Sequence, residues 1–122
     1  MNNIKTVILK NGLNIISYVE EAKYGKYVFQ CPFEIVVAPS QDGTMKMFLK
    51  ALNPYSKDDI FFIEKDDVLT ESEPLVNMVQ LYLSNAYLYK TKFKKNLTQL
   101  VSSSIENLEE LEDENQENQI LN

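Results

Sequence analysis

At Lys10-Asn11-Gly12-Leu13-Asn14-Ile15-Ile16-Ser17 the chain turns between two apolar runs, residues 6–10 and 13–21. Asparagine and glycine both tolerate positive φ, so Asn-Gly between such runs is typical of a tight turn that joins two antiparallel strands. A second stretch, Ile63-Glu64-Lys65-Asp66-Asp67-Val68, joins residues 60–64 to residues 68–72 in the same way. Together the two turns predict a mainly β protein, built as a small, strongly bent, antiparallel open barrel.

Two further segments complete the predicted sheet. Residues 27–38 are the longest strand candidate, and residues 44–52 largely alternate apolar and polar side chains. Pro32 interrupts the longer segment, so we expect an edge, a bulge or a bend there, because proline has no N–H for the ladder. Adjacent Ile15 and Ile16 break the alternation of their strand, which predicts a bulge or a strand covered on both faces.

The hydrophobic period changes after residue 72. Ser72-Glu73-Pro74 is typical of a helix start, and the apolar spacing of three and four that follows predicts a helix to about Lys90. A narrower heptad-like stripe runs from Leu97 to Leu111, and the polar composition beyond Glu112 predicts disorder. The expected organisation is a barrel (1–72), a helix packed on or beside it (73–92), and an acidic tail that is first helical and then disordered (93–122).

Several side chains have a structural expectation. The helix should cover an open end of the barrel or pack against neighbouring subunits, and its tyrosines suit a partly wet surface: Tyr82, Tyr87 and Tyr89. On the strand of residues 44–52, three side chains are expected to fill a gap in a core or an interface: Met45, Met47 and Phe48.

The chain contains no histidine, no arginine and no tryptophan, and it has one cysteine. Without histidine it lacks the side chain that most often moves protons near neutral pH, and it lacks any Ser-His or Cys-His pair. A metal site would be built from carboxylates and carbonyls, which favours calcium or magnesium. Cys31 lies in an apolar strand beside Pro32 and is expected to be a small buried filler. We therefore expect no catalysis, no cofactor and no metal.

Charge is distributed unevenly along the chain. Residues 1–92 carry ten lysines and eleven acids, whereas residues 93–122 carry two lysines and seven acids. The acidity is a property of the tail, which favours solubility or provides a protein-binding arm. No apolar run is long enough to cross a membrane, and the first residues lack the order of a signal peptide. We expect a cytoplasmic protein with no membrane partner.

The two turns resemble the signature of the Sm-like barrel, the family of LSm proteins and the bacterial host factor, over roughly residues 5–72. In the first half of that signature an Asn-Gly turn is followed by two apolar residues and a glycine. Asn11-Gly12-Leu13-Asn14-Ile15-Ile16-Ser17 follows this order with serine in place of the glycine. The second half is Ile-Arg-Gly-x-x-Ile, and Ile63-Glu64-Lys65-Asp66-Asp67-Val68 keeps both apolar ends with Glu-Lys in place of Arg-Gly.

The chain departs from the family at the RNA-binding loops. The family's first loop has an aspartate followed by Met-Asn, and Lys23-Tyr24-Gly25-Lys26-Tyr27 stands there instead. The arginine of the second loop is absent, and Lys65 lies in that loop. The predicted helix follows the last strand, whereas the family places one before the first strand. A closer likeness is to small Sm-like proteins of marine bacteriophages, which share the Asn-Pro turn, here Asn53-Pro54, and the trailing helix.

The resemblance implies five strands and a homo-oligomeric ring, in which the fourth strand of one subunit pairs with the fifth strand of the next. The residues that match those strands are the candidate subunit interface: Phe61, Phe62, Ile63, Val68, Leu69 and Thr70. Phe61 and Phe62 are adjacent and point to opposite faces of their strand. One face then serves the core and the other the neighbour; the alternative is that both belong to the core of a two-sided sheet.

The resemblance also singles out the two loops as candidate RNA-binding elements, with the residues Lys23, Tyr24, Lys26, Tyr27 and Lys65. Tyrosine stacks on unpaired bases and lysine offers charge to phosphates. The alternative is a solvated turn whose tyrosines pack on the rim of the barrel. Acidic neighbours of Lys65 disfavour phosphate at the second loop.

Two functions from different classes follow. The first is a non-catalytic Sm-like protein that forms a ring with itself, serves as a scaffold and binds single-stranded RNA weakly. The alternative is a phage virion-associated or protein-interaction accessory module, located in a bacterial host, that binds a protein through its helix or acidic tail and binds no nucleic acid. A small enzyme is disfavoured by the missing histidine and arginine.

Overall fold

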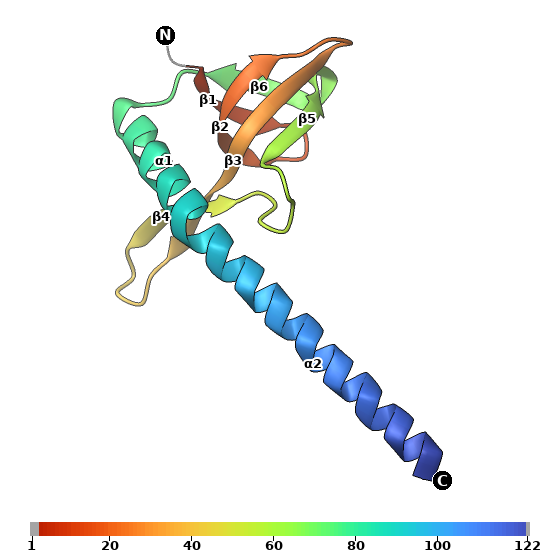
Figure 1. Cartoon of the computed structure of the whole chain (residues 1–122). Helices are drawn as coiled ribbons and strands as arrows, with labels where there is room; N and C mark the ends of the chain where they lie inside the picture. The colour runs from red at the N-terminus through yellow and green to blue at the C-terminus, as the bar shows by residue number, and fades with distance from the viewer. Residues whose placement is uncertain (1–2, 122) are drawn as a thin grey trace. The chain divides into compact units, whose positions relative to one another are not determined.

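The computed structural model describes residues 3–121, and the surroundings of side chains up to Glu112. The expected domain ends at residues 1 and 122 lie outside this part. The chain divides into two compact units, Met1–Tyr87 and Leu88–Asn122. Figure 1 labels the helices and strands along the chain. Within residues 3–121, no helix is long and apolar enough to cross a membrane.

The first unit contains an antiparallel sheet followed by a helix. Across residues 3–121 the sheet has six strands: β1 (Ile4–Leu9), β2 (Asn14–Glu21), β3 (Lys26–Pro39), β4 (Met45–Ala51), β5 (Ile60–Glu64) and β6 (Val68–Ser72). The strand order is β4-β3-β2-β1-β6, and β5 also pairs with β3. The predicted mainly β, antiparallel architecture with a following helix is confirmed.

The described residues form six strands where the family resemblance implies five, and the long strand β3 accounts for the difference. Its first part pairs with β5, from Lys26 opposite Glu64 to Gln30 opposite Ile60. Its second part, residues 33–39, pairs with β4. Residues 52–59 separate β4 from β5, as the separate strand candidates at residues 44–52 and 60–64 predict, and the two strands occupy successive parts of the same β3 edge.

A bulge separates the two parts of β3. Ile16 pairs with Phe33 and Tyr18 pairs with Gln30, so β3 carries one residue more than β2 over this interval. Cys31 lies in the left-handed region with φ of 52°, which is uncommon for a residue with a side chain. The irregularity predicted from Pro32 is confirmed, and buried Cys31 is the filler expected from sequence.

The core lies on one face of this curved sheet. A cluster of buried residues, Val7, Leu9, Ile15, Val19 and Phe29, comes from β1, β2 and β3. Residues of β5 and β6 pack against the same cluster, although these strands lie far apart in the strand order. Strands from both ends of the order thus share one core.

Strand β2 is covered on both faces, as one reading of its adjacent isoleucines predicts. Ile15 lies in the core cluster, whereas Ile16 is paired with Phe33 on the other face, and all three side chains are buried. The ring of Phe33 meets the ring of Tyr82 edge-on, with centroids 5.9 Å apart. Tyr82 comes from helix α1 (Val76–Leu88), so this helix contributes to covering the second face.

Tyr82 also connects α1 to the bulge of β3 through hydrogen bonds. Its hydroxyl accepts a hydrogen bond from the Tyr18 N–H at 3.2 Å and lies 3.0 Å from the carbonyl oxygens of both Gln30 and Cys31. The side chain is 3% exposed, so the expectation of a partly wet Tyr82 is wrong. The physical reason is the bulge, whose buried backbone groups take hydrogen bonds from the Tyr82 hydroxyl in place of water.

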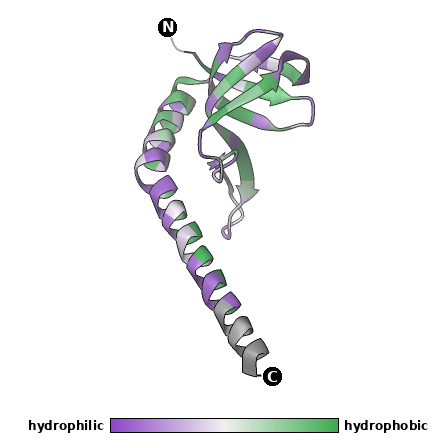
Figure 2. Ribbon diagram, turned by 45° about the vertical axis from the view of Figure 1, so that its right-hand side comes forward, coloured by the Kyte–Doolittle hydropathy of each residue, from purple (hydrophilic) through white to green (hydrophobic). Residues whose placement is uncertain are grey.

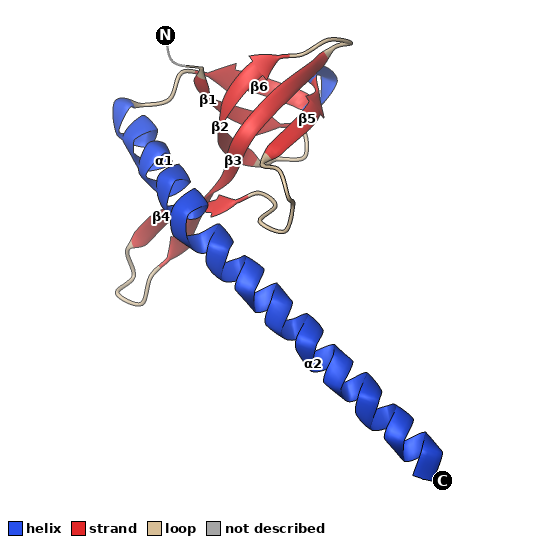
Figure 3. Ribbon diagram, in the orientation of Figure 1, coloured by secondary structure: helices blue, strands red, loops and turns tan. Residues whose placement is uncertain are grey.

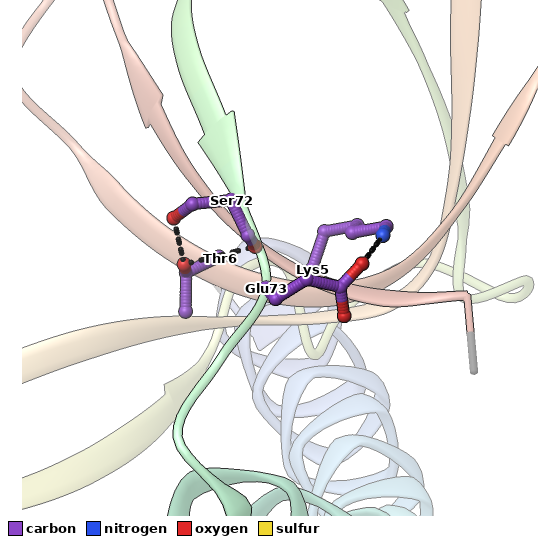
Figure 4. Close-up of polar contacts among 4 residues, drawn as sticks. All are labelled: Lys5, Thr6, Ser72 and Glu73. Carbon is purple, nitrogen blue, oxygen red and sulfur yellow. Dashed lines mark hydrogen bonds and ion pairs between the residues drawn. The ribbon is translucent and has the colours of Figure 1, made fainter. Parts of the chain in front are cut away.

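A set of polar contacts joins β1 to the chain just before α1 begins (Figure 4). Thr6 Oγ1 lies 2.8 Å from Ser72 Oγ and donates to the Ser72 carbonyl oxygen at 3.2 Å. The Lys5 ammonium forms an ion pair with Glu73. These contacts fix the end of β6, which is the point from which the helix departs.

The second unit is helical. It contains a π-helical turn, η2 (Tyr89–Phe93), followed by α2 (Lys94–Leu121). The Tyr89 and Phe93 rings stack with centroids 5.7 Å apart. Helix α2 includes the acidic stretch after Glu112, for which the composition predicts disorder.

Candidate subunit interface and lysine–tyrosine loop

Strands β5 and β6 each have an open edge. Strand β5 pairs with β3, and β6 pairs with β1; within residues 3–121 neither has a partner along its other side. The short 3-10 helix η1 (Lys65–Asp67) joins the two strands (Figure 3). Open edges present unpaired N–H and C=O groups, which are a template for pairing with another chain.

The side chains of β5 alternate between core and solvent. Phe61 and Ile63 pack against the core cluster, whereas Phe62 is 65% exposed and Ile60 is 46% exposed. The adjacent phenylalanines therefore point to opposite faces, as strand geometry requires. Leu69, on β6, which follows β5 in sequence but does not pair with it, is 66% exposed.

The six candidate interface residues fall into two groups. Those that pack against the core are Phe61, Ile63 and Val68. Those that are exposed are Phe62, Leu69 and Thr70. Phe62 and Leu69 are therefore apolar side chains on two open strand edges that the fold of the single chain leaves exposed.

A second exposed apolar group lies on the ribbon formed by β4 and the second part of β3. Four side chains on it are more than two-fifths exposed: Val37, Met45, Met47 and Phe48. Val37 pairs with Met47 across the two strands. The sequence predicts that Met45, Met47 and Phe48 fill a gap in a core or in an interface. Their exposure excludes the core of the single chain, so the interface is the alternative that remains.

The two candidate RNA-binding loops lie together at one end of the sheet. The Lys65 N–H donates to the Gly25 carbonyl oxygen at 3.0 Å. The Lys65 ammonium lies 5.3 Å from the centroid of the Tyr27 ring, and Lys26 pairs with Glu64 in the β3–β5 ladder. Pairing of β3 with β5 thus brings Lys65 beside a loop some forty residues away in sequence.

The two tyrosines of this site have different environments. Tyr24 is 92% exposed and has φ of 64°, followed by Gly25 with φ of 70°. Tyr27 is half-buried and packs against Phe29, with ring centroids 6.4 Å apart. Tyr24 therefore offers a free ring face for stacking, whereas Tyr27 packs against Phe29 of the core cluster.

Carboxylates offset the lysines of this site. Glu64 Oε1 lies 3.6 Å from the Lys26 ammonium, and Glu21 Oε1 lies 3.4 Å from the Lys65 ammonium. Burial, together with the charge and hydrogen bond of Glu71, raises the pKa of Tyr27 above its ordinary value. Glu21 and Glu71 are components that sequence reasoning missed. Glu21 adjoins the loop in sequence, but its ion pair with Lys65 depends on the fold, and only the folding of β6 brings Glu71 to Tyr27.

Among the residues whose side chains the structure describes, no three His, Cys, Asp or Glu side chains converge as a metal site requires. No family model matches the chain, and no curated protein matches its sequence. The open strand edges and the lysine–tyrosine loop are therefore the features of the chain that bear on its function.

Proposed function

We propose that this chain is a non-catalytic, Sm-like protein that assembles into a homo-oligomeric ring and serves as a scaffold with weak binding of single-stranded RNA. The strand topology supports the Sm-like barrel. Strands β1, β2 and β3 form a meander, β6 returns to β1, and η1 makes the tight connection from β5 to β6. A core shared by strands from both ends of that order is what a strongly bent barrel requires.

The observation that carries the ring is the pair of open edges with exposed Phe62 and Leu69. Pairing β5 of one subunit with β6 of the next satisfies both edges and covers both side chains. This contact is heterologous, because two different surfaces of the chain meet, and repetition of such a contact closes a ring when the rotation permits.

The absolute mass in solution tests the ring. Light scattering over a range of concentrations should give a mass several times the 14.1 kDa of one chain, and this mass should stay constant on dilution. A closed ring has no free edge from which to grow or shrink, which is why the mass should not drift. A monomer at every concentration would show that the ring proposal is wrong.

RNA binding is tested separately, because the ring does not require it. In a ring, each exposed Tyr24 and its lysines are repeated, so weak contacts add through multivalency. Titration with a fluorescent oligouridylate should show affinity that falls as salt rises. The double variant Lys23→Ala and Tyr24→Ala should lose this binding, whereas Lys46→Ala, on the distant ribbon, should retain it.

The second candidate function is a protein-interaction accessory module that uses the same fold without nucleic acid. The neutralisation of Lys26 by Glu64 and of Lys65 by Glu21 favours it, as does the exposed apolar ribbon. A stable ring that shows no salt-dependent binding of the oligouridylate would select this alternative.

A further inference from the structure

Helix α2 carries an exposed apolar stripe. Its members recur at spacings of three and four residues: Leu97, Leu100, Val101, Ile105, Leu108 and Leu111. The last five are between 46% and 63% exposed, and Figure 2 shows hydrophobic segments recurring among hydrophilic ones along this helix. A narrow stripe with this spacing is typical of the seam of a two-stranded coiled coil. Most of the stability of helices in proteins comes from packing of an apolar face, so we expect the stripe to have a covering partner.

Charged residues at the two ends of the stripe indicate that its partner is a second copy of the helix and that the two helices run in opposite directions. Lysines are concentrated before residue 96, at Lys90, Lys92, Lys94 and Lys95, and acids begin at Glu106 and continue at Glu109, Glu110 and Glu112. Residues 96–105 carry no charge. A second copy in the same direction would place lysine beside lysine and acid beside acid. A second copy in the opposite direction places the lysines beside the acids, which is electrostatically complementary.

We propose that α2 pairs in antiparallel fashion with α2 of a second copy of this chain, with the two-fold axis between Ser102 and Ser103. In this register Leu97 lies level with Leu108 of the second copy, and Leu100 lies level with Ile105. Every long apolar side chain between Leu97 and Leu108 then has the seam of the other helix to pack against. The inference rests on the helix alone and does not depend on the proposed ring, whose contacts use strand edges.

Cysteine cross-linking of the full chain tests both the pairing and its direction. In the double variant Leu97→Cys and Leu108→Cys, two disulfides should join two chains under mild oxidation. The two positions are eleven residues apart, about 16 Å along one helix, which is too far for a bond within a chain. Neither single variant should cross-link, because each cysteine then faces a leucine. The unmodified chain, whose Cys31 is buried, is oxidised in parallel.

A matched control uses the same helix levels on the opposite face. In the double variant Gln99→Cys and Glu106→Cys, each cysteine also lies level with the other cysteine of the second copy. Both lie on the opposite face of the helix from the stripe, so this variant should not cross-link. Cross-linking of the single variant at 97 or 108 would indicate parallel pairing and overturn the proposal. Equal yields from the stripe and the control pair, or no cross-linking in any variant, would overturn it as well.

Charge exchange gives an independent readout on residues outside the seam. The pair Lys92→Glu and Lys95→Glu, added to the cross-linking variant, should raise the concentration for half-maximal cross-linking about tenfold, since two ion pairs at each end become repulsive. Combination with Glu109→Lys and Glu112→Lys should restore it. Loss without restoration would contradict the antiparallel arrangement. Survival of this cross-linking in a Phe62→Asp background separates the helix contact from the ring contact.

Discussion

The hydroxyl of Tyr82 lies 3.0 Å from the carbonyl oxygen of Cys31, a residue 51 positions earlier in the chain. Cys31 is the left-handed residue of the β3 bulge, and the same hydroxyl accepts a hydrogen bond from the Tyr18 N–H. One side chain of α1 thus satisfies backbone groups from two strands at the place where the ladder between them is interrupted.

Removal of this hydroxyl should destabilise the fold. Tyr82→Phe removes one hydrogen-bonding group from the Tyr18 N–H and from the Gln30 and Cys31 carbonyl oxygens, and we expect a loss of about 1–3 kcal/mol in the free energy of unfolding. Urea denaturation measures the change. Tyr87→Phe is the matched control, because Tyr87 is 68% exposed, and its effect should stay within about 0.5 kcal/mol. Equal effects of the two variants would contradict the anchoring role of Tyr82.

Adjacent phenylalanines on β5 should give opposite phenotypes. Phe61 packs against the core, so Phe61→Ala should lower the free energy of unfolding by about 2–3 kcal/mol. Phe62 is exposed, so Phe62→Asp should leave the chain folded and lower its mass in solution. Denaturation and light scattering on both variants make the comparison. If the Phe62→Asp chain is folded and has the same mass in solution as the unmodified protein, β5 is not part of the subunit interface.

The turn between β3 and β4 should respond to acid. Hydrogen bonds from Ser40 and Thr44 lower the pKa of Asp42 to about 2, from an ordinary value of 3.8. Because the pKa is lowered in the folded chain, the stabilisation is present above about pH 4 and is lost as the pH falls towards 2. Carboxyl chemical shifts measured by NMR should show this titration. An Asp42 midpoint near 3.8 would indicate that the turn hydrogen bonds are absent in solution.

If the lysine–tyrosine loop binds RNA, its carboxylates should weaken the binding. Glu21→Gln with Glu64→Gln frees Lys65 and Lys26, and we expect the affinity for an oligouridylate to rise about three- to tenfold at low salt. Glu34→Gln with Asp58→Asn changes the net charge equally but away from the loop, so its effect should be smaller. Equal gains would show that net charge acts, and that the loop is not the binding site.

Local features of this chain were predictable from sequence. The Asn11-Gly12 turn joins β1 to β2, and Gly12 has φ of 93°. The Pro32 interruption marks the bulge of β3, and the change of apolar spacing marks the start of α1 within three residues. Each depends on the conformations open to a few neighbouring residues, which is why composition and spacing were sufficient.

Other features were not predictable, because the same pattern is compatible with several environments. The tyrosines of the helix predict a partly wet surface, and nothing in the helical spacing indicates the bulge on which Tyr82 is buried. The pairing of β4 and β5 with successive parts of one strand depends on β3 being long enough to pair with both. The approach of Lys65 to Tyr27 likewise follows from the β3–β5 register, which no short stretch of sequence determines.

The sequence by itself determined the mainly β class, the turns, the following helix and the absence of histidine and arginine chemistry. Only the tertiary structure decided that Phe61 lies in the core while Phe62 is exposed, that Tyr82 is buried, and that carboxylates from β2 and β5 neutralise the loop lysines. The physical reason is that turns and periodicity arise from local backbone preferences, whereas burial and charge pairing depend on contacts between segments distant in sequence.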